Sequence, residues 1–211
     1  MNRSLVEFCC SLLLFTLFVS RLGLADDDSE QEAPVEYRYE IASSPDANLV
    51  YEDTYYFEIV SPESLSYTYK LRQAKNFGGS FDRQYKKIRL VIAEPVEACR
   101  KIENPLGGAV ALVLRGGCSF LTKSNHAESA GALGVIIADN DVDNDDHMVD
   151  MVDDETGRAV GIPSMFLMGK DGVMIRRHLM MKGLTDAIIN IPVNLTGQTL
   201  GSAKLPPWTL W

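Results

Sequence analysis

The chain alternates between short apolar blocks, rich in β-branched and aromatic residues, and polar stretches rich in Gly, Pro, Asn and Ser. Blocks of four to eight such residues, bounded by turn-forming residues, are typical of β-strands. Two of them, in the middle of the chain, are continuously apolar, which favours strands buried on both faces. The pattern predicts strands over 54–60, 66–74, 87–95, 108–117, 134–140, 162–169 and 186–195.

Two further segments have helical patterns. Ser119 can serve as the N-cap of the first helix, and Ala127, Ala130 and Gly131 give it a small-residue face that allows close packing on a sheet. The second helix is predicted over 171–183, with Asp171 as the N-cap and a glycine as the stop. Many strands and two helices together indicate an α+β (mixed α/β) fold.

The first 25 residues have the features of a secretory signal peptide. Arg3 gives a positive start, 11–20 is apolar but too short to span a bilayer, and Gly23 and Ala25 are small residues at a cleavage site. We expect cleavage after Ala25, secretion through the endoplasmic reticulum and Golgi, and no membrane insertion afterwards. A membrane anchor is the alternative interpretation.

Two tails flank one domain, predicted over 51–196. The segment 26–50 is acidic and lacks periodicity, so it is predicted to be a tail. The segment 197–211 contains a Pro-Pro pair, which forbids a helix, and both tryptophans of the chain, Trp208 and Trp211. We expect these rings to dock on the domain, and an aromatic tail that binds a partner is the alternative.

Charge and cysteine content narrow the classes of protein. A formal net charge of −9 argues against nucleic-acid binding, which needs a basic face. Cys9 and Cys10 would leave with the signal peptide, so Cys99 and Cys118 remain, either as a disulfide in an oxidising compartment or as free buried thiols. Asn194 begins an Asn-Leu-Thr triplet, which predicts glycosylation in a secreted chain.

Catalytic motifs are missing from the sequence. It has no Gly-x-Ser-x-Gly nucleophile elbow and no His-Glu-x-x-His zinc motif. The three histidines, His126, His147 and His178, are far apart, and those at 126 and 178 are expected on solvated helix faces. We therefore predict a protein that is not an enzyme and has no cofactor. An unrecognised hydrolase remains an alternative.

The stretch 139–150 is strongly acidic and partly matches a calcium-binding EF-hand loop. Aspartates occupy positions 1, 3, 5, 7 and 12, but position 6 is Asn144 instead of glycine and position 12 is Asp150 instead of glutamate. A predicted strand, not a helix, leads into the stretch. We interpret it as an acidic rim, with irregular calcium binding by Asp141, Asp143 and Asp145 and a calcium-dependent structural or adhesive role as the alternative.

Residues 115–140 resemble the signature of the protease-associated domain family. The signature consists of Arg-Gly-x-Cys-x-Phe, a helix with an Ala-Gly-Ala stretch, and an apolar strand ending in Asp-Asn. The Ile-Pro at 162–163 resembles the entry to the next strand of the family, and Cys99 resembles the half-cystine that pairs with the signature cysteine. The resemblance covers roughly residues 54–193.

The resemblance implies a β-sandwich or barrel-like sheet with two flanking helices and a non-catalytic module that binds proteins or peptides. In plant sorting receptors of the family the signature loop is implicated in cargo binding, which implies Arg115, Gly116, Gly117 and Ser119 as ligand-binding residues, with Asn140 beside them. From the residues alone, we predict a rigid strand-to-helix corner whose helix N–H groups favour an anion. A purely scaffolding role for these residues is the alternative.

Overall fold

The computed structural model describes residues 54–195 and 203–209. The predicted signal peptide over 1–25 and the predicted tail over 26–50 lie outside these residues, as does Trp211. None of the helices in the described ranges is long and apolar enough to cross a membrane.

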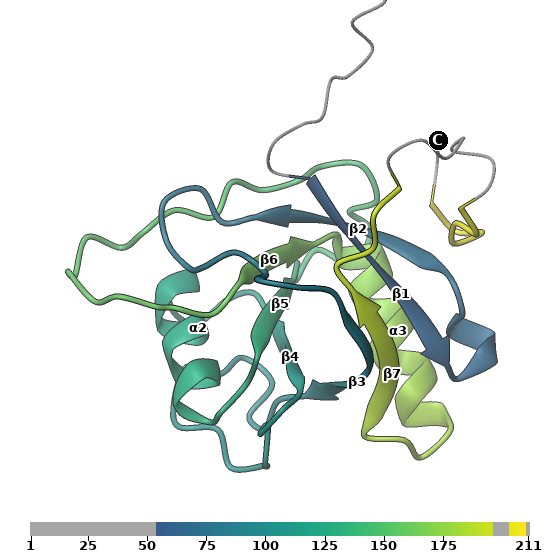
Figure 1. Ribbon diagram of the computed structural model, residues 1–211, viewed down its shortest axis with the longest axis horizontal. Coiled ribbons are helices and arrows are strands. Elements are labelled where there is room, and N and C mark those ends of the chain that lie inside the picture. Colours follow the sequence, from purple (N-terminus) through teal and green to yellow (C-terminus); the bar gives the residue numbers. More distant parts are fainter. Residues whose placement is uncertain (1–53, 196–202, 210–211) are drawn as a thin grey trace, which may run out of the picture. The chain divides into compact units, whose positions relative to one another are not determined.

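Seven strands form one closed barrel, as Figure 1 shows, with the order β1-β2-β6-β5-β4-β3-β7. The prediction of a β-sandwich or barrel-like sheet is confirmed as a barrel. Each predicted strand is present, with ends that differ from the predicted ones by up to four residues. The strands are β1 (Thr54–Ser61), β2 (Thr68–Gln73), β3 (Tyr85–Ile92), β4 (Val110–Leu114), β5 (Gly134–Ala138), β6 (Ser164–Leu167) and β7 (Asp186–Ile191).

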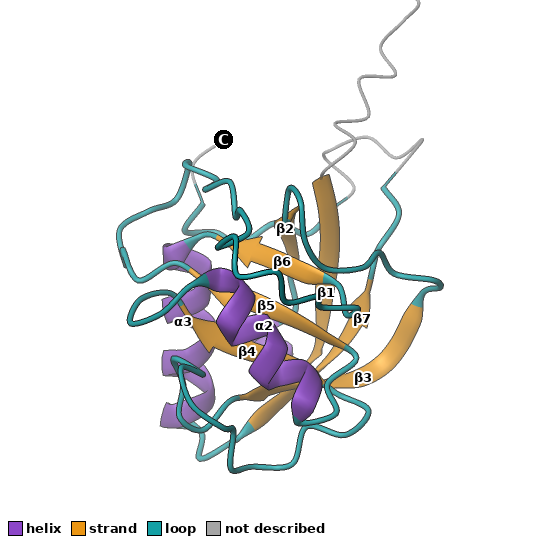
Figure 2. Ribbon diagram, turned by 90° about the vertical axis from the view of Figure 1, so that its left-hand side faces the viewer, coloured by secondary structure: helices purple, strands orange, loops and turns teal. Residues whose placement is uncertain are grey.

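Two α-helices lie beside the β4–β5 part of the barrel (Figure 2), and a short 3₁₀ helix follows β1. Within residues 54–195 and 203–209 the helices are α2 (Phe120–Ser129), α3 (Gly169–Met181) and the 3₁₀ helix η2 (Glu63–Leu65). The prediction that Ser119 caps the first helix is confirmed, since its side chain accepts a hydrogen bond from the backbone N–H of Thr122 at 3.1 Å.

The prediction that Asp171 caps the second helix is wrong. Helix α3 begins two residues earlier, at Gly169, and Asp171 is buried within its first turn. Glycine makes the earlier start possible, because a Cβ atom at residue 169 would lie 1.7 Å from the carbonyl oxygen of Asp141. A Cβ atom at Gly172 would lie 2.4 Å from that of Ala138, so the helix sits directly against β5.

Continuous apolar strands separate two hydrophobic clusters. In β4, Val110 and Leu112 face one cluster, and Ala111 and Val113 face the other. The first cluster also holds side chains of β1, β2, β7 and α3, and the second includes Ala127 of α2 and the two long loops beside it. The central strands therefore need apolar residues at successive positions, which explains why their sequences do not alternate.

Strands β3, β4, β5 and β6 run parallel to one another, so their carboxyl ends meet along one edge of the sheet, here called the carboxyl edge. The remaining neighbours are antiparallel. The segments that leave this edge are Ala93–Cys99, Arg115–Ser119, Asp139–Asp145 and Met168–Asp171. This topology brings the predicted site residues, far apart in sequence, to one end of the domain.

Residues 203–209, here called the strap, dock on the domain through Trp208. Its ring meets that of Tyr67 edge-on at a centroid distance of 5.4 Å, and its indole N–H donates a hydrogen bond to Oδ1 of Asp171 at 2.9 Å. The backbone N–H of Thr68 donates to the carbonyl oxygen of Lys204 at 2.7 Å. Docking of the tail is thus confirmed for Trp208.

Asp171 is only 2% exposed. Burial raises its pKa to about 6, although the hydrogen bond from Trp208 favours the ionised form. In the unfolded chain the pKa is about 4. The folded state therefore binds this proton more tightly, and the contribution of Asp171 to stability falls as the pH rises from about 4 to about 6.

Replacement of Asp171 by Asn removes this titration while keeping an oxygen for the indole N–H. We expect the free energy of unfolding of Asp171→Asn, relative to that of the unaltered chain, to increase by up to about 3 kcal/mol between pH 4 and pH 7. Urea unfolding at several pH values measures this difference. Parallel pH curves for the two proteins would contradict it.

Candidate functional site

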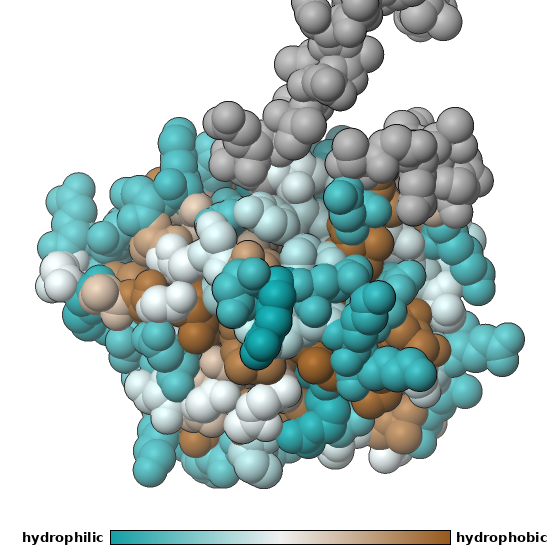
Figure 3. All heavy atoms as spheres, in the orientation of Figure 1, coloured by the Kyte–Doolittle hydropathy of each residue, from teal (hydrophilic) through white to brown (hydrophobic). Residues whose placement is uncertain are grey.

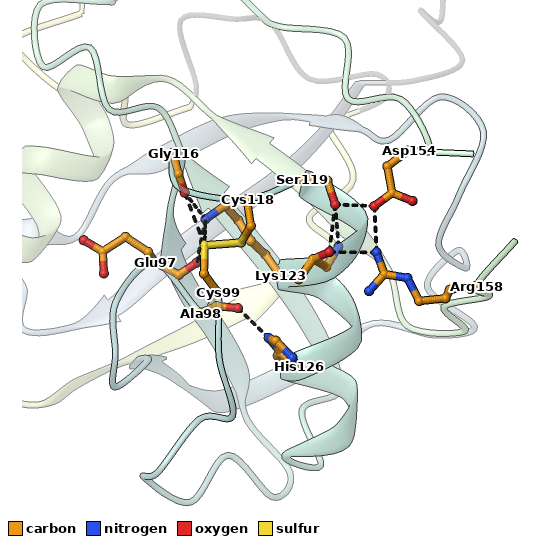
Figure 4. The surroundings of a disulfide bond; sticks show 11 residues. Glu97, Ala98, Cys99, Gly116, Cys118, Ser119, Lys123, His126, Asp154 and Arg158 are labelled. Atoms are coloured by element: carbon orange, nitrogen blue, oxygen red, sulfur yellow. Dashed lines mark hydrogen bonds and ion pairs between the residues drawn. A yellow bond between two sulfur atoms is a disulfide. The ribbon is translucent and has the colours of Figure 1, made fainter. Parts of the chain in front are cut away.

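A disulfide joins the turn after β4 to the segment after β3 (Figure 4). The sulfur atoms of Cys99 and Cys118 are 2.09 Å apart, which confirms the predicted pairing. Because the bridge spans 19 positions of the sequence, it stabilises the fold by about 3 kcal/mol in the chain-entropy model. Two segments of the carboxyl edge are therefore covalently held together.

The turn itself depends on two glycines. Gly116 and Gly117 have φ angles of 109° and 79°, a region that side-chain-bearing residues rarely adopt. A Cβ atom at Gly117 would also lie 3.0 Å from the sulfur of Cys99. The glycines thus let the backbone turn sharply against the disulfide, as the predicted strand-to-helix corner requires.

Lys123 lies under this corner and is fully buried. Its ammonium group donates hydrogen bonds to the carbonyl oxygens of Glu97 at 2.6 Å and Gly116 at 2.5 Å, and it lies 3.4 Å from the sulfur of Cys99 (Figure 4). These three contacts match the three donors of an ammonium group. Burial disfavours the charged form of Lys123 and lowers its pKa. The three contacts offset the free-energy cost of burying the ammonium group.

A second residue of α2 holds the same segment. Nδ1 of His126 lies 2.7 Å from the carbonyl oxygen of Ala98, a buried residue whose φ angle is 48°. The sequence predicts solvated helix faces for His126 and His178; both residues are half-buried and hydrogen-bonded, so these faces are only partly solvated. The helix therefore uses a lysine and a histidine, one turn apart, to fix the backbone that carries Cys99.

Arg115 links the ends of β4 and β5. Its guanidinium donates to Oδ1 of Asp139 at 2.9 Å, where the arginine side chain is 38% exposed and the aspartate 3%. Asn144 donates to the other carboxylate oxygen at 2.8 Å. Burial acts to raise the pKa of Asp139, but the hydrogen bonds from Asn144 and Arg115 outweigh it and hold the pKa below its usual value.

The rest of the signature lies around this pair. The ring of Phe120 packs against the second hydrophobic cluster, and its centroid is 5.9 Å from the Arg115 guanidinium carbon. Asn140 is exposed next to Asp139, and Gly117 is exposed at the tip of the turn. The structure therefore brings the predicted residues Arg115, Gly116, Gly117, Ser119 and Asn140 to one surface.

The anion preference of the α2 N-terminus is met within the chain. The Ser119 hydroxyl donates to Asp154, which belongs to the long loop between β5 and β6 (Figure 4). Hydrogen bonds from Ser119 and then Thr156 hold the pKa of Asp154 at about 2. Arg158 donates to both Asp154 and Thr122 at 2.7 Å. The loop thus supplies the carboxylate that an external ligand would otherwise bring.

The acidic stretch is partly engaged in contacts within the chain. Asp141 accepts a hydrogen bond from the backbone N–H of Asp143 at 3.1 Å, and Asp145 forms an ion pair with Lys170 at 2.7 Å. Across residues 54–195 and 203–209, no three His, Cys, Asp or Glu side chains are grouped to hold a metal ion. Calcium binding by Asp141, Asp143 and Asp145 stays a prediction.

The predicted glycosylation site follows β7. Asn194 is exposed and lines a cavity of about 510 Å³ together with Gln84 and Lys204. The threonine of its triplet lies outside the described residues. Modification of Asn194 stays a prediction.

Sequence reasoning missed the roles of Lys123, Asp154 and Arg158. The burial of Lys123 could have been predicted, because it stands four residues before Ala127 and therefore lies on the small-residue face of the helix. The other two lie in a loop without periodicity, where nothing in the sequence indicates that they fold back onto α2.

Replacement of Lys123 by Met keeps the length of the side chain but leaves the carbonyl oxygens of Glu97 and Gly116 without their buried donor. We expect Lys123→Met to lower the free energy of unfolding by about 2–4 kcal/mol. Urea unfolding measures this loss. The exposed Lys101 provides the matched control, and Lys101→Met should change stability by less than about 0.5 kcal/mol. Equal effects of the two substitutions would refute the role of Lys123.

Comparisons with known proteins identify relatives of the domain. A family model described as "PA domain" matches residues 86–175. The chain is 45% identical over 160 residues to the PRADC1-like protein of Drosophila melanogaster, covering 74% of this chain and 82% of that protein. It is 33% identical over 102 residues to signal peptide peptidase-like 2 of Arabidopsis thaliana, covering 47% of this chain but only 18% of that protein.

A zinc aminopeptidase from Bacillus subtilis shows a distant structural likeness, with 19% identity and a TM-score of 0.46 over 65% of this chain and 30% of that structure. The family model covers the segment from β3 to α3, which contains the disulfide, the glycine turn and Lys123. With the fly relative matching most of both chains, the protein belongs to the PA domain family.

Proposed function

We propose that this chain is a secreted, non-catalytic glycoprotein whose PA domain binds a protein or peptide partner at the carboxyl edge. The observation that carries the proposal is the corner formed by residues 115–119 and Asn140. The disulfide, Lys123 and His126 hold its backbone in place from below. A rigid surface loses little conformational entropy when a partner binds.

The exposed part of the corner is small and polar. Gly117 and Asn140 are exposed, and the guanidinium of Arg115 is partly exposed while it remains paired with Asp139. The exposed turn backbone at Gly117 and the amide of Asn140 can form hydrogen bonds with a peptide backbone. The partly exposed guanidinium of Arg115 can bind an acidic group of a peptide. Ser119 already bonds to Asp154, so it supports this surface from behind instead of facing a partner.

One face of the domain is chemically mixed (Figure 3). Figure 3 shows, on the face seen in Figure 1, hydrophobic areas separated by hydrophilic side chains. Protein interfaces that form and dissociate are commonly mixed in this way.

A hydrolase has one feature in its favour, a contact between Ser64 and His178. The serine hydroxyl lies 2.5 Å from Nε2 of the histidine, as a nucleophile and its base would. A catalytic base also needs a group that orients its ring. Within the described ranges, no hydrogen bond joins His178 to a carboxylate. We interpret the contact as a link between η2 and α3.

The proposal is tested by affinity capture from secreted fractions, with the full chain as bait and mass spectrometry as the readout. Asn140→Arg places a bulky cation on the corner without touching the core. We expect it to reduce capture of the specific partner at least tenfold, because the new side chain blocks the surface.

Met180→Arg is the matched control. Met180 is 68% exposed near the end of α3, and since α3 starts at the carboxyl edge and runs back along the sheet, it lies at the opposite end of the domain. This variant should capture the partner as well as the unaltered chain does. Equal capture by both variants, or no reproducible partner, would overturn the proposal.

A further inference from the structure

The strap contacts a pocket that is separate from the corner. Tyr67 and the backbone N–H of Thr68 form one side of it, at the start of β2, and Asp171 in the first turn of α3 forms the other. We call this the indole pocket. In addition to Trp208, the strap contributes Lys204, whose ammonium lies 5.0 Å from the Tyr67 ring centroid, and the buried Pro206.

The chemistry of the pocket is specific for an indole. Tyr67 provides an aromatic surface, and Asp171 provides a carboxylate oxygen at 2.9 Å from the indole nitrogen. A flat apolar ring with one N–H group satisfies both partners at once. Phenylalanine could fill the same space, but it has no donor and would leave the buried carboxylate oxygen without its hydrogen bond.

The burial of Asp171 indicates that the pocket is built for this contact. None of the ion pairs found among the described residues involves Asp171, although this residue is only 2% exposed. A buried carboxyl group destabilises a fold unless hydrogen bonds compensate it. The indole N–H supplies such a bond from a segment that is remote in sequence, so the strap behaves as a ligand attached to its own receptor.

We propose that the indole pocket is a peptide-recognition site for a Pro-Pro-Trp segment, which the strap occupies as a built-in ligand and which the strap of a second copy of this chain can also enter. The strap is held by the Trp208 side chain, by one backbone hydrogen bond and one cation–π contact of Lys204, and by the buried Pro206, with no strand pairing. Such a small set of contacts can exchange between molecules. This site does not depend on the corner or on the proposed function.

Tethering explains why the built-in segment normally prevails. A segment attached to the same chain has an effective concentration in the millimolar range, so a free peptide of equal intrinsic affinity competes poorly. Loss of Trp208 from the strap removes this competition. The pocket then becomes available to a peptide supplied in solution.

The probe is a fluorescently labelled peptide with the sequence of residues 203–209, Ala-Lys-Leu-Pro-Pro-Trp-Thr, and the readout is fluorescence anisotropy with the full chain. We expect Trp208→Ala to bind the peptide at least tenfold more tightly than the unaltered chain does. A peptide with Ala in place of Trp should bind Trp208→Ala at least tenfold more weakly than the original peptide does. The double variant Tyr67→Ala, Trp208→Ala should bind the original peptide at least tenfold more weakly than Trp208→Ala does.

Trp208→Phe keeps a ring against Tyr67 but cannot donate to Asp171, so the experiment remains decisive if Trp208→Ala does not fold. We expect this variant to bind the peptide more tightly than the unaltered chain and less tightly than a folded Trp208→Ala. Equal binding by the unaltered chain and the folded variants would overturn the proposal. Binding that does not require the tryptophan of the peptide would overturn it as well.

Discussion

The ammonium group of Lys123 determines the arrangement of the carboxyl edge. It bonds to the carbonyl oxygens of two segments that follow two different strands, and it belongs to the helix that follows the second of them. The disulfide joins the same two segments, but a disulfide alone leaves the backbone on either side free to rotate. The lysine removes that freedom, because its three donors are all used in one buried position.

This arrangement explains why the residues of the signature act as a unit. The glycines permit the turn, Cys118 ties it to Cys99, and Ser119 starts the helix that brings Lys123 under the turn. A change in any of them would move the carbonyl oxygens that accept hydrogen bonds from the buried ammonium group of Lys123. The loop between β5 and β6 completes the unit by placing a carboxylate at Ser119, which leaves the outer rim of the corner as its exposed part.

Much of the fold could be predicted from the sequence, because short apolar blocks and turn residues are local signals. All seven strands, both helices and the N-cap Ser119 were accessible in this way. The start of α3 was not, since Asp171 has the residue type of a cap, and only the tertiary contacts of Gly169 and Gly172 show that the helix begins earlier.

The candidate site was predictable to a smaller degree. Resemblance to a family identified Arg115 and its neighbours, but not the groups that hold them. Asp154 is 35 positions from Ser119, and Trp208 is 37 positions from Asp171. Contacts at such separations depend on how loops cross the surface, and neither periodicity nor residue type indicates their course.

The apolar sequences of β4 and β5 have a consequence for strand alignment. Because these strands face a hydrophobic cluster on each side, a slip of one residue would still place apolar side chains in both clusters, and hydrophobicity alone discriminates poorly between registers. The pair Arg115–Asp139 stands one position beyond the aligned residues Leu114 and Ala138. A slipped register would separate its charges and remove the cationic partner of a buried carboxylate, so a polar pair at the strand ends selects the alignment of an apolar sheet.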